Sequence, residues 1–274
     1  MFRSIRVHQS RIGNRSLLTA FIIFALIGFA AQIVDGALGM AYGVISSTIL
    51  VATGIPPAQA SAAIHAAEMF TTAASGSSHL YHRNVDWQLF WRLAPFGMIG
   101  GCLGAYVLTS VDASVARPFV TIYLGLIGAY LLFRSFKKVP SRPVPAKVVA
   151  PLGLIGGFLD AAGGGGWGPT VTTGLLGAGG APRYVIGTVS ISEFLITTSV
   201  SLTFLIAILT GHWEEAEGIS SMLVPVSGLI VGGLLAAPLA AYVVRYVNET
   251  VLLRLVGVLI ILIAAYQAYG FLTK

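Results

Sequence analysis

Residues 156–169 read Gly-Gly-Phe-Leu-Asp-Ala-Ala-Gly-Gly-Gly-Gly-Trp-Gly-Pro, so four glycines follow one another at 163–166. Such a run interrupts a helix, because glycine loses more conformational freedom on folding than any other residue. In hydrocarbon, each backbone group left without a hydrogen bond costs several kcal/mol. A break of this kind is therefore expected only where the backbone faces protein, water or a ligand.

The sequence around this break has the composition of an integral membrane protein. Hydrophobic residues make up 56% of the 274 residues and charged residues only 9%, whereas a soluble domain carries about 25% charged residues. The apolar runs at 17–34, 115–133 and 251–265 are long enough to cross, or nearly cross, a hydrocarbon core of roughly 30 Å. We therefore predict an all-α, polytopic fold in which residues 1–274 form a single membrane domain.

The chain divides into two related halves. We predict a first repeat at 17–136, a basic linker at 137–148 and a second repeat at 149–272. Each half is expected to hold a helix pair broken at glycines and three longer helices. The ten expected segments are 17–35, 38–53, 58–81, 88–110, 114–136, 149–162, 166–180, 184–210, 218–245 and 249–272. The matched positions are Gly36 with Gly165 and Gly39 with Gly168 at an offset of 129, and Pro57 with Pro182 and Glu68 with Glu193 at an offset of 125.

The number of crossings follows from the positions of the basic residues. Arginines precede the first span and further basic residues fill the linker, so the positive-inside rule places both the N-terminus and the linker in the cytoplasm. Five crossings per half would separate them. One partial span per half, giving about eight effective crossings and parallel halves, removes the conflict. The alternative is an inverted five-plus-five repeat that breaks the charge rule at one end.

The two glycine breaks are candidate anion sites. A helix that starts at a break directs unpaired N–H groups and a partial positive charge toward whatever precedes it. We expect the substrate-binding backbone at Gly36, Gly39, Gly163, Gly164, Gly165 and Gly166. Glycines can also simply allow helices to pack closely, which we prefer for scattered glycines but not for the run at 163–166.

Polar residues inside the expected spans form a second group of candidates. Substrate-binding side chains are expected at His65, Thr72, Ser190, Ser192 and Thr197. Carboxylates inside a span are costly unless paired or neutralised, so we assign proton coupling to Glu68, Glu193, Asp35 and Asp160. The alternatives stay open: the glutamates cap backbone breaks or pair with His65, and the two aspartates cap the following helix starts.

Several classes of protein are disfavoured. The sequence has no nucleophile elbow and no phosphate-binding loop, so neither a hydrolase nor an ATP-driven pump is expected. We predict no cofactor, and no metal site, because no cysteine pair, carboxylate cluster or histidine pair has ligand spacing. The single cysteine, Cys102, is expected to pack as a small hydrophobe.

At the glycine breaks the chain resembles the sulfite exporter TauE/SafE family. The resemblance rests on Ile27-Gly28-Phe29 running to Asp35-Gly36 and Gly39, on Gly156-Gly157-Phe158 running to Gly163–Gly166 and Pro169, on the turns at 54–57 and 180–182, and on the polar stretch at 65–72. It covers about residues 17 to 272. It implies a bacterial inner-membrane permease for small sulfur-containing anions, such as sulfite or sulfonates. The first break departs from the glycine-rich pattern, with Asp35 and Met40 where Gly164 and Pro169 stand.

We therefore expect a secondary transporter that exports a small sulfur-containing anion and is proton-coupled. A passive anion channel and a membrane enzyme are the alternatives. The expected partners are a small anionic substrate and the lipid bilayer, with no nucleic acid, and a homo-oligomer stays open. The expected location is the cell inner membrane, with a cytoplasmic N-terminus.

Overall fold

The structure is a computed structural model that describes residues 2–136, 144–213, 222–243 and 249–272. The described residues form helices and connecting turns, without strands, which confirms the all-α polytopic fold class. Four of their helices are long and apolar enough to cross a membrane, and shorter apolar helices lie at Tyr42–Ala52, Leu223–Ala237 and Arg254–Gly270. Two of the features discussed from the sequence fall partly outside the described residues: the basic linker, at 137–143, and the acidic loop, at 214–218.

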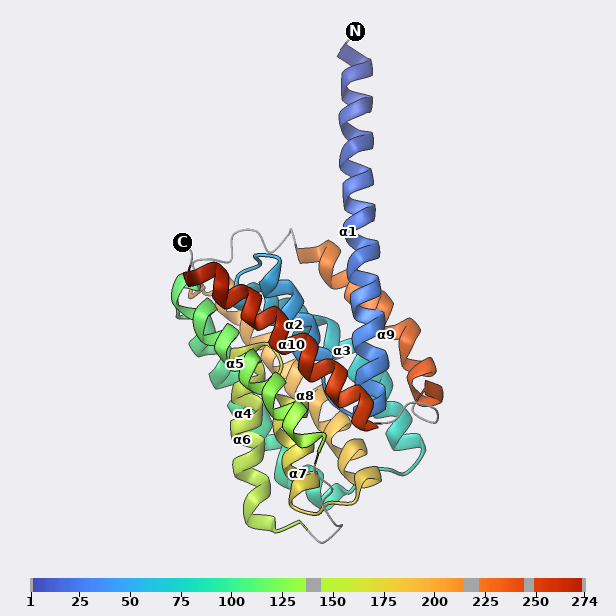
Figure 1. Cartoon of the computed structure of the whole chain (residues 1–274), viewed down its shortest axis with the longest axis vertical. Coiled ribbons are helices and arrows are strands. Elements are labelled where there is room, and N and C mark those ends of the chain that lie inside the picture. Colours follow the sequence, from blue (N-terminus) through green and yellow to red (C-terminus); the bar gives the residue numbers. More distant parts are fainter. Residues whose placement is uncertain (1, 137–143, 214–221, 244–248, 273–274) are drawn as a thin grey trace.

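The first half consists of five helices with a break after the first. They are α1 (Phe2–Leu38), α2 (Tyr42–Ala52), α3 (Pro57–Tyr81), α4 (Trp87–Thr109) and α5 (Ala113–Arg134). Helix α1 extends well beyond the bundle at its N-terminal end (Figure 1). Proline at the first position starts α3, and Asp86 caps α4 by accepting from the N–H groups of Gln88 and Leu89, as expected for helix starts.

The second half repeats this order with a more irregular second segment. Its elements are α6 (Ala146–Gly163), the π-helical turn η1 (Gly168–Thr172), α7 (Thr173–Gly177), α8 (Pro182–Leu209), α9 (Leu223–Val243) and α10 (Glu249–Leu272). The helix expected at 166–180 is thus a π-helical turn followed by five α-helical residues. A π-helical turn is a rare element that is frequently found at functional sites.

The first break lies further along the chain than the sequence suggested. Helix α1 continues through Gly36, which is exposed, and ends at Leu38. Left-handed backbone at Gly39 (φ 65°) and Ala41 (φ 106°) then separates it from α2. Gly36 lies inside regular helix because a single glycine weakens a helix without ending it, whereas Gly39 stops it as a left-handed C-terminal residue.

Close glycine contacts define how the halves pack. A Cβ at Gly157 of α6 would lie 2.1 Å from the carbonyl oxygen of Gly97 in α4, and one at Gly104 would lie 2.4 Å from that of Phe158. Residue numbers rise together along both helices, so α4 and α6 run parallel. Helices α1 and α9 pack in the same way, through Gly228 against Phe21 and Gly232 against Ala25. Each half therefore packs its first helix against the fourth helix of the other half.

The two halves run in opposite directions. Helix α3 crosses α8 antiparallel, because Gly76 lies against Ile191 while His65 lies beside Phe204. Helices α5 and α10 are also antiparallel and lie side by side (Figure 1): Thr121 bonds Gln267, and Gly128 packs on Ile260. Equivalent helices are therefore antiparallel, and the repeat is inverted.

The preference for parallel halves was wrong. Helix α2 has 11 residues, roughly 16 Å at 1.5 Å per residue, which is only about half of a hydrocarbon core. The starts of α3 and α9 line one cavity, through Gln59 and Val226, and Thr71 contacts Gly233 further along, so α3 runs parallel to α9. Because α1 also runs parallel to α9, α2 and the turns on either side return the chain to the face at which the α1 span began. Gly54, after α2, accepts a hydrogen bond from Arg117 at the start of α5.

The structure aligns the halves at one offset of 125 residues. Gly39 and Gly164 have φ values of 65° and 70°, and Gly54 and Gly179 have φ values of 97° and 104°. Gly28 contacts Leu229 of α9, as its partner Gly153 contacts Leu93 of α4. The offset of 129 suggested for the first break is therefore one helical turn out of register.

Candidate functional site

A small buried cavity lies where the two glycine breaks meet. It is lined by Ala41, Tyr42, Gly43, Val44, Glu68, Asp160, Gly165, Gly166, Gly168, Pro169 and Glu193. The space open to the centre of a water-sized sphere is about 10 Å³, which is room for about one water molecule. The lining comes from both halves, so the inverted repeats converge on this point.

Asp160 organises the second break. It sits near the end of α6, and its Oδ1 accepts hydrogen bonds from the N–H groups of Gly166 (2.7 Å) and Trp167 (3.0 Å). Gly164 and Gly165, with φ values of 70° and 144°, turn the chain back so that these amides reach the carboxylate. Asp160 therefore caps the start of the segment after the break, which is one of the two alternatives considered for this residue.

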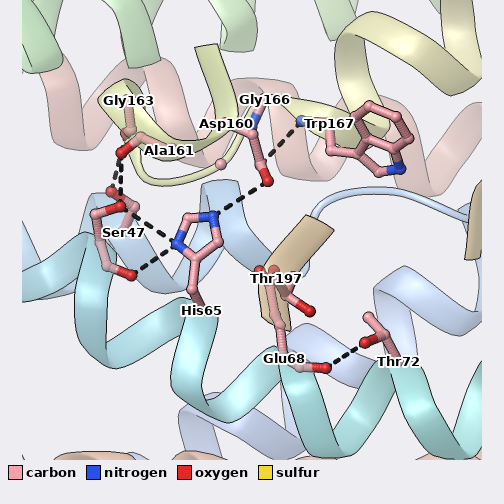
Figure 2. A network of polar contacts seen from close by, with 12 residues as sticks. Ser47, His65, Glu68, Thr72, Asp160, Ala161, Gly163, Gly166, Trp167 and Thr197 are labelled. Atoms are coloured by element: carbon pink, nitrogen blue, oxygen red, sulfur yellow. Dashed lines mark hydrogen bonds and ion pairs between the residues drawn. The ribbon is translucent and has the colours of Figure 1, made fainter. Parts of the chain in front are cut away.

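His65 binds the other side of Asp160. Its Nε2 lies 3.2 Å from Asp160 Oδ2, and its Nδ1 lies 2.7 Å from the carbonyl oxygen of Ser61 one turn earlier. The Ser61 hydroxyl donates to the carbonyl of Ala161 at 2.6 Å. Figure 2 displays this network, which fastens α3 of the first half to the end of α6 in the second.

The first break has an equivalent but weaker arrangement. Asp35 Oδ1 accepts from the N–H of Tyr42 at 3.3 Å, seven residues later, as Asp160 accepts from Trp167. Position 190, the counterpart of His65, is a serine. The hydrogen bonds at the second break are therefore stronger and more numerous than those at the first.

Hydroxyl groups also tie each break to the other half. Ser47 Oγ donates to the carbonyl of Gly163 at 3.3 Å, and Thr172 Oγ1 donates to the carbonyl of Gly39 at 3.0 Å. Ser47 and Thr172 are equivalent at the offset of 125. These bonds satisfy carbonyl groups at helix ends that would otherwise lie unpaired in the membrane.

Glu68 differs from the other acidic residues. Its side chain is only 2% exposed, and its Oε2 has no hydrogen-bond partner among the described residues. It lies one turn after His65 on α3 and lines the cavity opposite the break backbone, with Glu193 of α8 in the same lining. The two glutamates, which the repeat makes equivalent, thus reach one cavity.

The remaining candidates lie around the cavity rather than in it. The hydroxyl groups of Thr72, Ser192 and Thr197 donate to carbonyls of their own helices, those of Glu68, Thr188 and Phe194. Ser190 is buried beside them. Gly39, Gly163 and Gly164 flank the lining, and Gly36 is exposed on α1. A hydroxyl that donates to its own helix offers an anion no proton in this conformation.

Some of the lining was missed by sequence reasoning. Tyr42, Gly43 and Val44 begin α2, and Gly168 and Pro169 begin η1. Tyr123 of α5, close beside the break, donates to the carbonyl of Gly165 at 3.3 Å. The signal for the first group is the consistent offset of 125, which pairs Tyr42 with Trp167 and Gly43 with Gly168. Tyr123 has no such signal.

The site also has donor atoms that a metal could use. Ligand atoms of His65, Glu68 and Asp160 lie within 4.8 Å of one another. His65 and Asp160 already bind each other and the backbone, however, so only Glu68 has an unused oxygen. The expectation of no metal stays a prediction. Its spacing argument could not detect this group, because Asp160 comes from the other half of the chain.

A larger cavity lies elsewhere. It has a volume of about 480 Å³ and opens at the outer ends of α4 and α8, where Asp86, Arg92 and Tyr184 are among its lining residues. The candidate residues are absent from this lining. The smaller cavity at the breaks is therefore the one to which the sequence and the inverted repeat both point.

Inverted helical repeats that meet at broken helices in a buried polar cavity are typical of membrane transporters. Residues 24–267 match the family described as "Sulfite exporter TauE/SafE". A relative from Bacillus subtilis (strain 168), the "Probable membrane transporter protein YtnM", is 45% identical over 251 residues, which cover 89% of this chain and 81% of the relative. The chain therefore belongs to the sulfite exporter TauE/SafE family and is a multi-pass membrane protein.

A second relative is more distant. A "Probable membrane transporter protein" of Haemophilus influenzae is 27% identical over 111 residues, covering 40% of this chain and 43% of that protein. No solved structure matches this chain at a significant level. The family and both relatives are thus transporters, and the names of the two relatives do not specify a substrate.

Proposed function

We propose that this chain is a secondary transporter, not an enzyme, that exports a small sulfur-containing anion such as sulfite or a sulfonate in a proton-coupled manner. One observation carries the proposal: both glycine breaks and both equivalent glutamates line one buried cavity between inverted halves. The membership of the sulfite exporter family supports the class of substrate.

Backbone amides are the groups that would bind the anion. The first-turn N–H groups of Gly43 and Val44 in α2 have no partner within their own helix, because the first N–H groups of a helix have no carbonyl one turn before them. They line the cavity together with Gly168. Asp160 already occupies the amides of Gly166 and Trp167, so α2 provides the donors that no carboxylate of the protein occupies.

The size of the cavity supports a carrier rather than a channel. Sulfite has four non-hydrogen atoms and needs more room than the one water molecule that the cavity admits. The break segments must therefore separate for the anion to bind. A continuous open pore is not needed for this step, whereas alternating access around a central site is.

We place the protein in the bacterial inner membrane. The face that bears the end of α5 and the start of α6, here called the linker face, lies in the cytoplasm. The inverted repeat puts this face opposite the start of the α1 span, so the basic N-terminus and the basic linker cannot both be cytoplasmic. Basic residues of the described part favour the linker face, which carries Arg83, Arg92, Arg134, Lys147, Arg183 and Arg254. The other face carries Arg117 and the four arginines that begin α1. By the positive-inside rule, the N-terminus is then outside.

The direct test is anion flux into liposomes that contain the purified chain. A side chain at Gly165 would place Cβ 2.3 Å from the amide nitrogen of Val44, at a φ of 144°. We therefore expect Gly165→Leu to abolish the flux of sulfite. The matched control is Gly270→Leu, because no atom lies within 4 Å of a Cβ built there. Absence of flux for sulfite and for sulfonates in the unaltered protein would contradict the proposed function.

A further inference from the structure

The number of protons bound at the central cavity depends first on His65 and Asp160. The carbonyl of Ser61 can only accept a hydrogen bond, so His65 Nδ1, 2.7 Å away, carries a proton. Nε2 faces Asp160 Oδ2 at 3.2 Å, and this contact requires a second proton between the two atoms. The pair therefore holds one proton beyond neutral histidine and carboxylate, and it is neutral as a unit. Nothing in this pair compensates a further negative charge.

Glu68 and Glu193 are left without such compensation. The acidic and phenolic groups that line the cavity with Glu68 are Tyr42 of α2, Asp160 of α6 and Glu193 of α8. Asp35 of α1 lies nearby and accepts a hydrogen bond from the amide of Tyr42. No Lys or Arg is among the residues that line the cavity. The unpartnered Oε2 of Glu68 is buried at the same place. A buried carboxylate without a partner is strongly disfavoured, and the half-buried Glu193 in the same lining would repel it if both were ionised.

This arrangement determines whether a bound proton favours or opposes binding of the anion. An anion placed beside ionised Glu68 and Glu193 would be repelled, whereas protonated glutamates remove the repulsion and can donate hydrogen bonds to it. Because linkage is reciprocal, a bound anion also increases the affinity of the cavity for protons. Two ligands that favour each other's binding occupy the carrier together.

We propose that the cavity takes up its anion together with at least one proton held on Glu68 and Glu193, so that anion and proton cross the membrane in the same direction. This inference rests on the proposed function and adds the coupling sign and the residues that set it. Export remains compatible with it. A divalent anion accompanied by one proton still carries negative charge, and a membrane potential that is negative inside drives that charge outward.

The test measures protons and anions in the same liposomes. The full-length protein is reconstituted with a pH-sensitive dye inside, and the membrane potential is clamped with potassium and valinomycin. The probes are sulfite and methanesulfonate. Methanesulfonate remains ionised near neutral pH, so it does not carry a proton by itself. We expect an inward gradient of either transported anion to acidify the interior.

The variants separate coupling from folding. Wild-type anion flux is expected to fall by about tenfold per pH unit above the titration range, as for a single essential proton. Glu68→Gln and Glu193→Gln should each flatten this profile and reduce the acidification. Asp112→Asn is the control, because Asp112 caps α5 in the α4–α5 turn and asparagine caps equally well.

The outcomes are distinguishable. Flux with no change of internal pH, alkalinisation during uptake, or flux that requires sodium without acidification would each overturn the co-transport of protons while leaving anion transport intact. If a glutamine variant fails to fold, the pH profile of the wild-type protein and the direction of its proton movement still decide the question. Absence of any anion flux would contradict the proposed function itself.

Discussion

At the scale of single residues, the site depends on a carboxylate that occupies the place of a ligand. Sequence reasoning located the helix starts at the breaks as binding sites for an external anion. In the structure, Asp160 fills the amides of Gly166 and Trp167 and also binds His65. The protein thus provides its own anion at the second break, and the substrate must bind at the remaining donors.

The first prediction concerns this carboxylate. Asp160→Ala would remove three hydrogen bonds and leave His65 buried beside an unfilled space, so we expect a loss of about 3–5 kcal/mol of stability. Asp160→Asn retains an oxygen that can accept from Gly166 and Trp167, and should lose less. Thermal unfolding of the purified variants in detergent measures the difference. Equal losses for the two variants would show that the amide hydrogen bonds contribute little.

The second prediction concerns the hydroxyls that tie the breaks to the opposite half. Ser47→Ala and Thr172→Val each remove one hydrogen bond to a break carbonyl, and each should reduce stability by about 1 kcal/mol. Because Ser47 and Thr172 are equivalent, the two losses should be similar. The control is Ser227→Ala, an exposed position where the hydroxyl bonds only its own helix. A loss there as large as at the breaks would contradict the proposed role.

At the scale of elements, the glycine contacts decide which helices move together. Gly97 and Gly157 let α4 and α6 approach backbone to backbone, and α1 and α9 meet through an equivalent set. Contacts this close permit little sliding, because any side chain at the contact would overlap the neighbouring backbone. The rigid units of the molecule are therefore pairs of helices drawn from different halves.

The third prediction follows from one of these contacts. Gly157→Ala would place Cβ 2.1 Å from the carbonyl oxygen of Gly97, so α4 and α6 must separate, at a loss of about 1–3 kcal/mol. Gly177→Ala, where no atom lies within 4 Å of the added Cβ, should leave stability nearly unchanged. Thermal unfolding in detergent compares the two. Unchanged stability of Gly157→Ala would mean that this contact is looser than the structure indicates.

The elements themselves were largely predictable from the sequence. Apolar runs and prolines located most of the ten segments, because the thickness of the hydrocarbon core and the chemistry of helix starts act locally. The π-helical turn at Gly168–Thr172 and the continuation of α1 through Gly36 were not predicted. Both depend on tertiary contacts: Gly168 packs against Met40 of the other break, and α1 packs along α9.

At the scale of the whole molecule, the inverted repeat sets the relation between the site and the two membrane faces. The sequence indicated two halves but not their relative direction, since the basic N-terminus and the basic linker point to the same compartment. The His65–Asp160 contact was equally hidden, because it joins residues 95 positions apart in the chain and no local pattern marks it. The pairing of Glu68 with Glu193 was visible because it follows the repeat.

The fourth prediction tests the orientation of the chain. In a protein that lacks Cys102, single cysteines are introduced at Ser110 and at Gln88, two exposed positions on opposite faces. A membrane-impermeant maleimide applied to intact cells, or to spheroplasts where the outer membrane excludes it, should label the Ser110→Cys variant. The Gln88→Cys variant should be labelled only after permeabilisation. The reverse pattern would place the N-terminus in the cytoplasm and the linker outside.

The exchange of partners between the halves, with α1 on α9 and α4 on α6, also constrains how such a molecule could have arisen. A single five-helix unit of this kind buries its first and fourth helices mainly against a second unit that lies upside down in the membrane. A half-length ancestor would therefore have had to insert in both orientations with similar frequency. Fusion of two copies into one chain fixes one orientation for each half and frees each to acquire its own charges.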